Sequence, residues 1–401
     1  MEDSTQPLDI APLFEPFAIE GLRLPNRFVM PGMQRGWCEQ GVPDVRLAEY
    51  YRRRIQGGVS LIVTEACAVD HPAATQGPSF GRLTGAALAA WEMCVRAVHE
   101  AGGKIFIQLW HEGAVRAEGG TGPYSQIPTV SPSGLIQGGK PNGRAATCED
   151  LDSIKAAFVA SAQAARSIGA DGVEVHACHG YLLDQFLWAD TNHRTDGYGG
   201  DSVTDRVRFP AEVVAGVRRA LGTGFPISFR MSQWKEVDFE ARIVQSPAEL
   251  QALLDPLVAA GVSVFHVSTR RFFLPEWPES SLGFAGWVKR LCGVPVIAVG
   301  SVGLDRDVME SLSGQQTQSR VETGLRELVR RMRAQEFDLI AIGRSSIADP
   351  DFVTKVRQGR FDDIRTFRLE HLQLEEFSEH TVDGFREHTR RQAGGPDPEQ
   401  L

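Results

Sequence analysis

The chain has 401 residues, of which 42% are hydrophobic and 23% charged, a composition typical of globular proteins with a large core. Its formal net charge of -9, with acidic and basic residues interspersed, argues against nucleic acid or an anionic membrane as a partner. No apolar run approaches the roughly 18–20 residues that a membrane-spanning helix needs.

The six cysteines lie far apart, and none belongs to a Cys-x-x-Cys motif. This spacing predicts reduced thiols and argues against a zinc ribbon or an iron–sulfur cluster. The N-terminus is acidic and contains prolines, unlike a signal or transit peptide. We therefore expect a cytoplasmic protein.

Residues 13–27 alternate between apolar and polar side chains around Glu20-Gly21, which is the pattern of a β-hairpin. Beyond them, an apolar strand, a loop and an amphipathic helix recur along the chain, and the strands are continuous Val/Ile/Phe runs typical of buried parallel strands. The predicted strands are Phe28–Met30, Ser60–Thr64, Lys104–Leu109, Gly172–His176, Phe225–Met231, Val262–Val267, Val294–Val299 and Asp338–Ile342. Eight such units predict an α/β fold, a (β/α)8 barrel, and we expect the hairpin to close its amino-terminal end.

Helices are predicted over 45–55, 85–101, 149–168, 203–221 and 247–260, and four of them are followed by a glycine, which commonly ends a helix. Two segments exceed the minimal barrel. Residues 110–148 form a long Gly/Pro/Ser-rich loop after the third strand, and residues 313–335 add a polar link and an amphipathic helix. We assign residues 1–365 to the barrel and 366–401 to a C-terminal extension, partly helical and partly disordered.

Functional side chains of a (β/α)8 barrel lie at the carboxyl ends of its strands. The fourth predicted strand ends in His176, and His179 and Tyr181 follow at once. Two imidazoles and a phenol in one small volume can donate hydrogen bonds to an anionic oxygen and transfer a proton. This group is the predicted reactive centre.

The last two strands end in glycines, Gly300 and Gly343, and Arg344 follows the second. Loops at these positions commonly bind phosphate, and a guanidinium adds a bidentate contact. Arg230 ends the fifth strand, where a buried cation needs an anionic partner such as a reduced flavin. Gln108 has both a donor and an acceptor for the pyrimidine edge of the same ring.

Several motifs together resemble the Old Yellow Enzyme family of FMN-dependent ene-reductases, over roughly residues 13–360. They are FVMPGMQ, VTEACAV, FIQLWH, the block GVEVHACHGYLLDQFLWADTNHRTDGYGG, Arg230, AVGS and IAIGR followed by DP. The resemblance implies that FMN lies across the barrel mouth. The cofactor-binding residues it implies are Pro31, Gly32, Met33, Gln34, Ala66, Gln108, Arg230, Gly300, Ser301, Gly343 and Arg344.

The resemblance also implies the reaction. NADH or NADPH reduces the flavin, and an α,β-unsaturated carbonyl compound then takes the hydride from flavin N5. His176 and His179 are implied to bind the carbonyl oxygen, Tyr181 to donate a proton, and Trp37 and Trp110 to contact the substrate. The expected partner is thus a small enone-type molecule, and the charged C-terminal helix is a candidate contact in a homo-oligomer.

The chain departs from the family at Gln34, where members usually have Thr or Cys. It also departs near Gly36, where bacterial relatives often have a Tyr, and Trp37 is a candidate to replace that aromatic residue. The loop 119–143 and the insertion 313–335 have no obvious counterpart. The iron–sulfur cysteines and the second nucleotide-binding domain of larger relatives are absent from the sequence.

Three other functions remain open from the residues alone. A flavin-dependent N-demethylase or amine dehydrogenase would need an aromatic cage or a carboxylate for a cation. A flavin-free barrel enzyme of the Schiff-base type would need a lysine inside the barrel, but Lys104 begins a strand and Lys235 lies beyond the fifth. A non-catalytic flavin-binding protein would not need the His/His/Tyr set. No metal site is predicted, because we find no third ligand with suitable spacing beside the two histidines.

Overall fold

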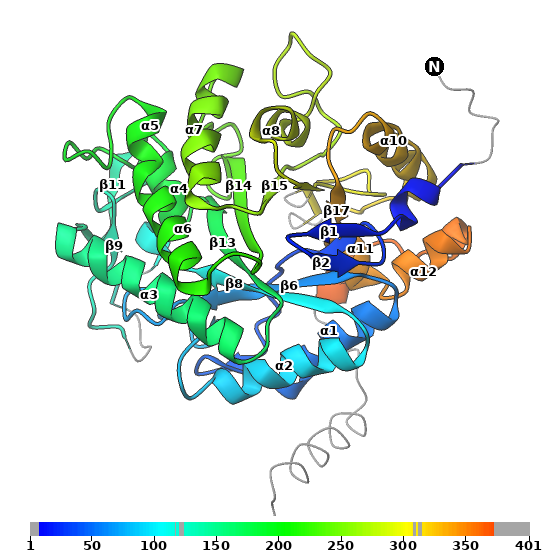
Figure 1. Cartoon of the computed structure of the whole chain (residues 1–401), viewed down its shortest axis with the longest axis horizontal. Helices are drawn as coiled ribbons and strands as arrows, with labels where there is room; N and C mark the ends of the chain where they lie inside the picture. Colours follow the sequence, from blue (N-terminus) through cyan, green and yellow to red (C-terminus); the bar gives the residue numbers. More distant parts are fainter. Residues whose placement is uncertain (1–7, 117, 120–123, 308–309, 312–314, 373–401) are drawn as a thin grey trace, which may run out of the picture.

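The computed structural model describes residues 8–372 except 117, 120–123, 308–309 and 312–314. A single parallel sheet closes on itself, because the last barrel strand pairs with the first and the first also pairs with the second (Figure 1). The strands of this barrel are β3 (Phe28–Met30), β6 (Leu61–Ala68), β8 (Lys104–Trp110), β13 (Gly172–His179), β14 (Ile227–Lys235), β15 (Val264–Ser268), β16 (Val296–Val299) and β17 (Leu339–Ala341). The predicted (β/α)8 barrel is confirmed.

Helices cover the outside of the sheet (Figure 1). The longer ones are α1 (Val45–Gln56), α2 (Leu88–Glu100), α3 (Cys148–Ser167), α6 (Arg208–Leu221), α7 (Pro247–Ala260), α8 (Phe284–Cys292) and α10 (Val321–Arg333). Local chemistry fixes their ends: Thr147 forms a capping box with Asp150, and Ser246 accepts a hydrogen bond from the Glu249 amide. Gly261 ends α7 with a φ of 105°, which a residue with a side chain would adopt only under strain.

The N-terminal hairpin consists of β1 (Phe17–Ile19) and β2 (Leu22–Leu24). Its turn residues Glu20 and Gly21 have φ values of 45° and 85°, the left-handed pair that a tight two-residue hairpin needs. Ile19 and Leu24 are fully buried in one cluster with side chains of the barrel strands, among them Phe106. The hairpin therefore closes one end of the barrel, as predicted (Figure 1).

Short strands and helices make up the rest of the fold. The short strands are β4 (Cys38–Glu39), β5 (Val42–Pro43), β7 (Gly81–Arg82), β9 (Val130–Ser131), β10 (Leu135–Ile136), β11 (Lys140–Pro141) and β12 (Arg144–Ala145). The short helices are η1 (Ala11–Phe14), η2 (Gly113–Val115), η3 (Gln137–Gly139), α4 (Leu182–Leu187), α5 (Val203–Arg206), α11 (Arg344–Ala348), α12 (Phe352–Arg357), η4 (Phe361–Asp363) and η5 (Leu369–Leu372).

The structure differs from the predicted elements in three places. The helix predicted over 203–221 is two helices, α5 and α6, with Val207 between them. Helix α8 was not predicted. In the insertion 313–335 the helix begins only at Val321. Of the predicted C-terminal extension, Phe367 and Leu372 join a cluster with Leu304 and Ile347, whereas residues 373–401 lie outside the described part; the proposed domain boundary stays a prediction.

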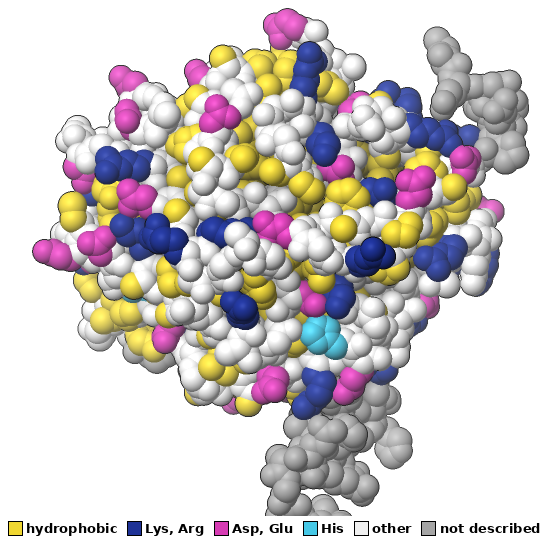
Figure 2. All heavy atoms as spheres, viewed as in Figure 1, with side chains coloured by type: hydrophobic (Ala, Val, Ile, Leu, Met, Phe, Trp, Pro, Cys, Tyr) yellow, Lys and Arg dark blue, Asp and Glu magenta, His cyan; other side chains and the backbone are white. Residues whose placement is uncertain are grey.

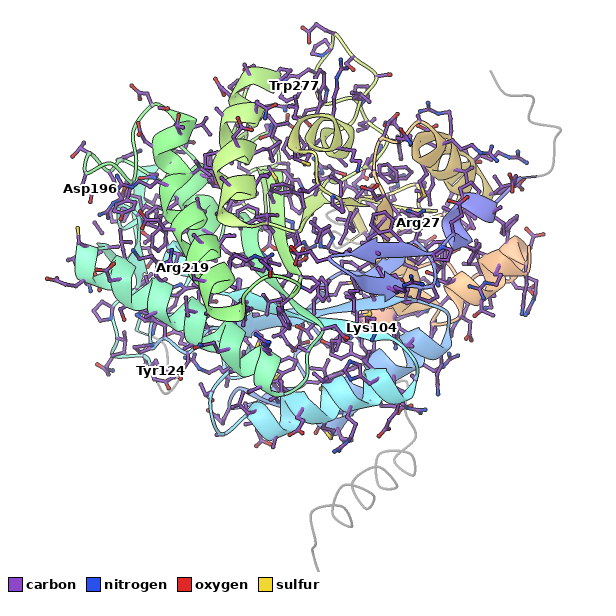
Figure 3. All side chains as sticks on the ribbon, in the orientation of Figure 1. Arg27, Lys104, Tyr124, Asp196, Arg219 and Trp277 are labelled. Atoms are coloured by element: carbon purple, nitrogen blue, oxygen red, sulfur yellow. The ribbon has the colours of Figure 1, made fainter. Side chains whose placement is uncertain are left out.

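Charged side chains of both signs alternate over the face seen in Figure 2, and no large area of one sign is present on that face. Lys104 begins β8 on this side of the molecule and forms an ion pair of 3.2 Å with Asp171 (Figure 3). Among the described residues, no helix is long and apolar enough to span a membrane.

Candidate active site

A cavity of about 690 Å³ lies at the carboxyl ends of the barrel strands, within the usual size range of small-molecule sites. Each of the eight barrel strands or the loop that follows it contributes lining residues. Of the site residues predicted from the sequence, those that line the cavity are Pro31, Gly32, Met33, Gln34, Ala66, Gln108, Trp110, His176, His179, Tyr181, Arg230, Gly300, Ser301, Gly343 and Arg344. Widely separated parts of the chain thus meet in one place.

Trp37 is the predicted site residue that the structure does not place on the cavity wall. Its ring packs edge-on against Tyr50 at 5.5 Å, with the guanidinium of Arg35 at 4.6 Å from its centre. These contacts hold the indole beside helix α1, so the expectation that Trp37 contacts the substrate is not supported. Trp110, by contrast, lies on the wall with its ring centre 5.2 Å from that of Tyr181.

The end of β13 brings His176, His179 and Tyr181 together. The register between β13 and β14 shifts between Ala177 and His179, and His179 has a φ of 65°. This bulge turns both imidazoles into the cavity although they are three positions apart in a strand. The ring centres of His176 and His179 are 5.7 Å apart, and that of Tyr181 is 5.2 Å from His176.

Burial keeps all three groups uncharged. Burial and the positive charge of Arg230 lower the pKa of His176 to about 3, and the same two causes lower the pKa of His179 well below its usual value. Burial and nearby Glu236 raise the pKa of the Tyr181 phenol. Near neutral pH the site therefore presents two neutral imidazoles, each with one N–H, and a protonated phenol.

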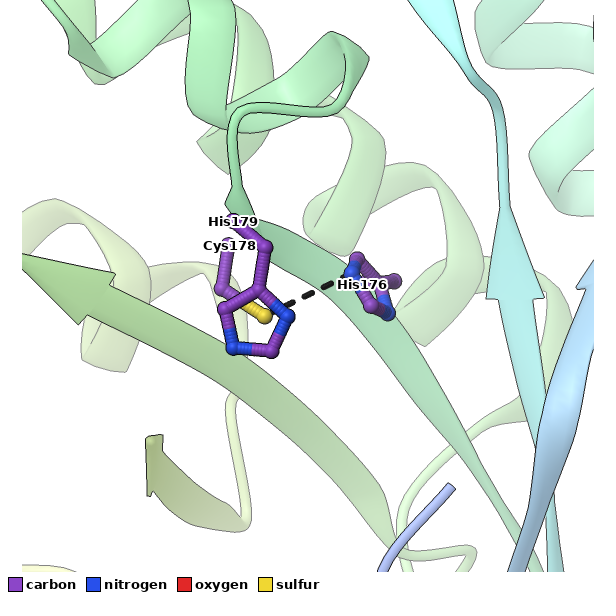
Figure 4. A group of neighbouring side chains, drawn as sticks. All are labelled: His176, Cys178 and His179. Carbon is purple, nitrogen blue, oxygen red and sulfur yellow. Dashed lines mark hydrogen bonds between the residues drawn. The ribbon is translucent and has the colours of Figure 1, made fainter. Parts of the chain in front are cut away.

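The position of Cys178 corrects the prediction that no third candidate metal ligand lies beside the two histidines. Its sulfur is fully buried and lies 3.4 Å from His176 Nε2 (Figure 4). The candidate ligand atoms of His176, Cys178 and His179 all lie within 4.8 Å of one another, so a third group suited to a metal does stand beside the two histidines. Burial raises the pKa of this thiol well above its usual value, which disfavours the thiolate that a metal requires.

A buried carboxylate that the sequence analysis missed, Glu174, holds one of the cavity-lining side chains, Gln108. Glu174 on β13 is fully buried and accepts hydrogen bonds from Gln108 Nε2 at 2.8 Å and Ser228 Oγ at 2.8 Å, and its other contact is His266 Nδ1 at 2.7 Å. Burial opposes its ionisation, but His266, Arg230 and Gln108 outweigh burial and lower its pKa to about 2. The sequence did contain a signal for this residue, because Glu174 is a charged residue inside an apolar strand.

Arg230 lines the cavity and is 6% exposed. Its Nη1 donates to the Gly32 carbonyl at 3.3 Å, and its Nε has no hydrogen-bond partner among the residues that the structure describes. Such a buried donor is costly unless a ligand satisfies it. On the neighbouring wall, Gln34 Nε2 donates to Glu65 Oε1 at 3.2 Å.

Ser301 and Arg344 meet at the ends of β16 and β17, as the sequence predicted. Arg344 Nη2 donates to Ser301 Oγ at 2.8 Å, and its Nη1 donates to the Asp307 carbonyl at 2.8 Å. Burial lowers the pKa of Arg344 to about 10, which still leaves it positive near neutral pH. Ser301 has a φ of 53°, an uncommon conformation that here presents backbone and hydroxyl to the cavity.

Lys235 does not serve as a lysine inside the cavity. It is the last residue of β14 rather than lying beyond that strand, and its ammonium is fully buried in an ion pair of 2.8 Å with Asp184. Lys235 is not among the residues lining the cavity. The geometry therefore gives no support to a Schiff-base enzyme.

Residues 12–363 match the model of the NADH:flavin oxidoreductase / NADH oxidase family. The chain is 33% identical to an NADH oxidase of Thermoanaerobacter brockii over 88% of its own length and 52% of the relative's. It is 31% identical to a cinnamate reductase of Clostridium sporogenes, covering 88% of this chain and 54% of that protein. The chain thus spans about half the length of the first curated relatives that it matches. The structure of a morphinone reductase in complex with tetrahydroNAD superposes with a TM-score of 0.72 at 28% identity, covering 90% of this chain and 93% of that one.

Proposed function

Because the chain belongs to the NADH:flavin oxidoreductase / NADH oxidase family, which includes Old Yellow Enzyme, we propose that it is an FMN-dependent ene-reductase. Its substrates are α,β-unsaturated carbonyl compounds, and NADH or NADPH is the electron donor. The observation that carries this proposal is the contact of His176, His179 and Tyr181 around one cavity. Two of the similar proteins, named cinnamate reductase and morphinone reductase, support it.

The residues of the cavity fit FMN. Within the described part of the chain, Arg230 Nε, His176 Nδ1 and Trp110 Nε1 are buried polar atoms without a hydrogen-bond partner, which is expected where a polar ligand supplies the missing bonds. At Gly32 a side chain would lie within 2.7 Å of Gln108 Nε2, so glycine keeps this wall open. Met33, Gln34, Ala66, Gln108 and Arg230 would hold the ring, and Ser301, Gly343 and Arg344 would hold the phosphate. When bound, FMN supplies the hydride-carrying chemistry that no side chain has.

His176 and His179 stabilise the substrate's carbonyl oxygen. As neutral imidazoles, they donate hydrogen bonds that strengthen as negative charge develops on that oxygen, and this difference lowers the barrier. His179 Nε2 lies 2.8 Å from Ser268 Oγ, a contact that orients its ring. A charged imidazolium is not required at any point.

Tyr181 is the acid of the reaction. Burial raises the pKa of its phenol, so the phenol is still protonated near neutral pH and can transfer the proton on Oη to the substrate's α carbon. Its ring is held edge-on by Trp110 at 5.2 Å, which fixes the direction of transfer. Phe80, Trp110 and Trp234 line the same cavity and exclude water from the reacting atoms.

The proposal is tested by substituting His176 in the FMN-loaded enzyme and following conversion of 2-cyclohexenone to the saturated ketone with NADH or NADPH. Removal of one oxyanion donor typically costs on the order of 10²–10³ in rate, so His176→Ala should lower kcat/KM for the enone by about that factor. His193 is exposed and does not line the cavity, so His193→Ala should keep the wild-type value. No saturated ketone from the wild-type enzyme, or flavin reduction by N-methylated amines instead of nicotinamides, would refute the proposal.

A further inference from the structure

Glu236 is a cavity residue that the reaction above leaves unused. It follows β14 directly and lines the cavity beside the histidines. Its Oε2 accepts a hydrogen bond from Tyr181 at 3.3 Å, and its Oε1 is 3.9 Å from His179 Nδ1. Its side chain is 50% exposed.

No lysine or arginine among the described residues forms an ion pair with Glu236, and its one ionic contact is with His179, which is uncharged. By contrast, Glu276 forms an ion pair with Arg242, Asp307 with Arg270, and Asp184 with Lys235. Burial raises the pKa of Glu236, and its bond from Tyr181 and the charge of Arg230 oppose that change. Arg230 acts on Glu236 without forming an ion pair with it, so the carboxylate still gains from direct contact with a positively charged ligand group.

Aromatic rings border the same part of the cavity. Trp234 lies two residues before Glu236 with its ring centre 4.5 Å from that of His179, and Trp110 lies 4.9 Å from Phe80 and 5.2 Å from Tyr181. All these rings are on the cavity wall. Faces of Trp, Tyr and Phe attract cations, most strongly when the cation is partly removed from water.

We propose that Glu236, with the neighbouring aromatic rings, forms a subsite for a positively charged group, and that the preferred substrates are activated alkenes that carry a protonated or quaternary amine. The inference rests on the proposed ene-reductase function and names its substrate class. The two imidazoles fix the carbonyl oxygen at one side of the substrate, and the carboxylate then binds the amine near the cavity mouth. Discrimination between a cation and a neutral group of the same shape comes mainly from the Glu236 carboxylate, because the ring faces add only a weaker attraction for the cation.

The test uses two maleimides of equal shape, N-(2-trimethylammonioethyl)maleimide and its neutral isostere N-(3,3-dimethylbutyl)maleimide. With the FMN-loaded wild-type enzyme at low ionic strength, we expect kcat/KM to be about tenfold higher for the cation, and the ratio to fall as added salt screens the charge. In Glu236→Gln, which keeps an acceptor for Tyr181, the ratio should fall toward one. Glu240→Gln changes the same charge on the same loop outside the cavity and should keep the wild-type ratio.

A binding measurement separates the subsite from the reaction. Calorimetric titration with the two corresponding succinimides, which cannot be reduced, should give the same tenfold preference in Kd and its loss in Glu236→Gln. Equal values for the two compounds in the wild-type protein, or an unchanged ratio in Glu236→Gln, would overturn the inference. Equal slowing of both maleimides by Glu236→Gln would also overturn the inference, because it would mean that Glu236 acts by positioning Tyr181. If neither maleimide is reduced, the ene-reductase proposal fails, and the succinimide titration still decides on the subsite.

Discussion

Arg230 has more hydrogen-bonding capacity than the protein uses. Its side chain is 6% exposed and one Nη donates to a backbone carbonyl, whereas no described residue accepts a hydrogen bond from Nε. Glu174, the carboxylate whose pKa Arg230 helps to lower, is already bonded to Gln108, Ser228 and His266. The guanidinium therefore provides charge and a donor for a ligand in the cavity.

Removal of this charge should weaken FMN binding and lower the flavin's reduction potential. A hydrogen bond to a charged group contributes about 1.5–3 kcal/mol, so Arg230→Met should raise the Kd of FMN on the order of ten- to a hundredfold. The potential falls because the negative reduced ring loses its cationic neighbour. Fluorescence titration of the apoprotein and a spectroscopic redox titration measure the two effects. The control Arg219→Met removes an exposed charge on α6. If it changed the Kd of FMN and the reduction potential as much as Arg230→Met does, Arg230 would have no specific role in holding the flavin.

Glu65 makes the stability of the protein depend on pH. It is buried behind Gln34, and burial raises its pKa to about 7, although hydrogen bonds from the Arg35 amide, Cys38 and Gln34 oppose the shift. Because the folded-state pKa lies above the unfolded value, the protonated form favours folding. That stability is complete below the unfolded pKa and is lost as the pH rises through about 7.

Glu65→Gln should remove this loss. Relative to the wild type, the free energy of unfolding of the variant should increase by about 2–3 kcal/mol between pH 5 and pH 8, because one pKa unit corresponds to 1.36 kcal/mol. Urea unfolding at both pH values provides the comparison. Glu92→Gln, at an exposed site on α2, should show no change with pH relative to the wild type. Parallel pH curves for wild type and Glu65→Gln would show that Glu65 does not titrate in this range.

At the scale of secondary structure, the β1–β2 hairpin is the element that completes the barrel core. Leu24 is fully buried against the barrel strands, whereas Arg23 beside it is exposed. Leu24→Ala should lower the free energy of unfolding by about 2–5 kcal/mol, the usual cost of a core truncation, and Arg23→Ala by less than about 0.5 kcal/mol. Denaturant unfolding of the FMN-free proteins measures both. A loss at Leu24 no larger than that at Arg23 would mean that the hairpin does not close the core.

The regular elements could be predicted because their periodicity is local. The apolar runs located all eight barrel strands, and Glu20-Gly21 located the hairpin turn. Helix α8 was missed because it has only nine residues, one of them Gly286, although its apolar residues do follow helical spacing. The division of α5 from α6 at Val207 has no signal stronger than Pro210 three residues later.

The site residues also differ in whether their signal is local in the sequence. His176, His179 and Tyr181 could be predicted because they lie close together in the sequence. Glu236 was missed because its role depends on a contact with Tyr181 that spans 55 positions, and Glu174 because its partners lie on three other strands. Trp37 was proposed because relatives often have an aromatic residue near Gly36, and the structure does not place it on the cavity wall, since position in the sequence does not show which way an indole turns.

At the scale of the whole molecule, the barrel gathers lining residues from all eight of its strands or the loops after them around one mouth, with the phosphate-type residues Ser301 and Arg344 on one side and the His/His/Tyr group on another. Under the proposed function, one cavity of about 690 Å³ would receive nicotinamide and enone in turn. We propose that the two substrates react separately, each with the same bound flavin.

Anaerobic spectroscopy of the FMN-loaded protein separates the two half-reactions. We expect one equivalent of NADH or NADPH to bleach the visible flavin band. It also predicts that one equivalent of 2-cyclohexenone or a maleimide, added without oxygen, restores the band and is recovered as the saturated product. A protein that shows no flavin band after FMN is supplied, or one whose bleached flavin is not reoxidised by either alkene, would contradict the account.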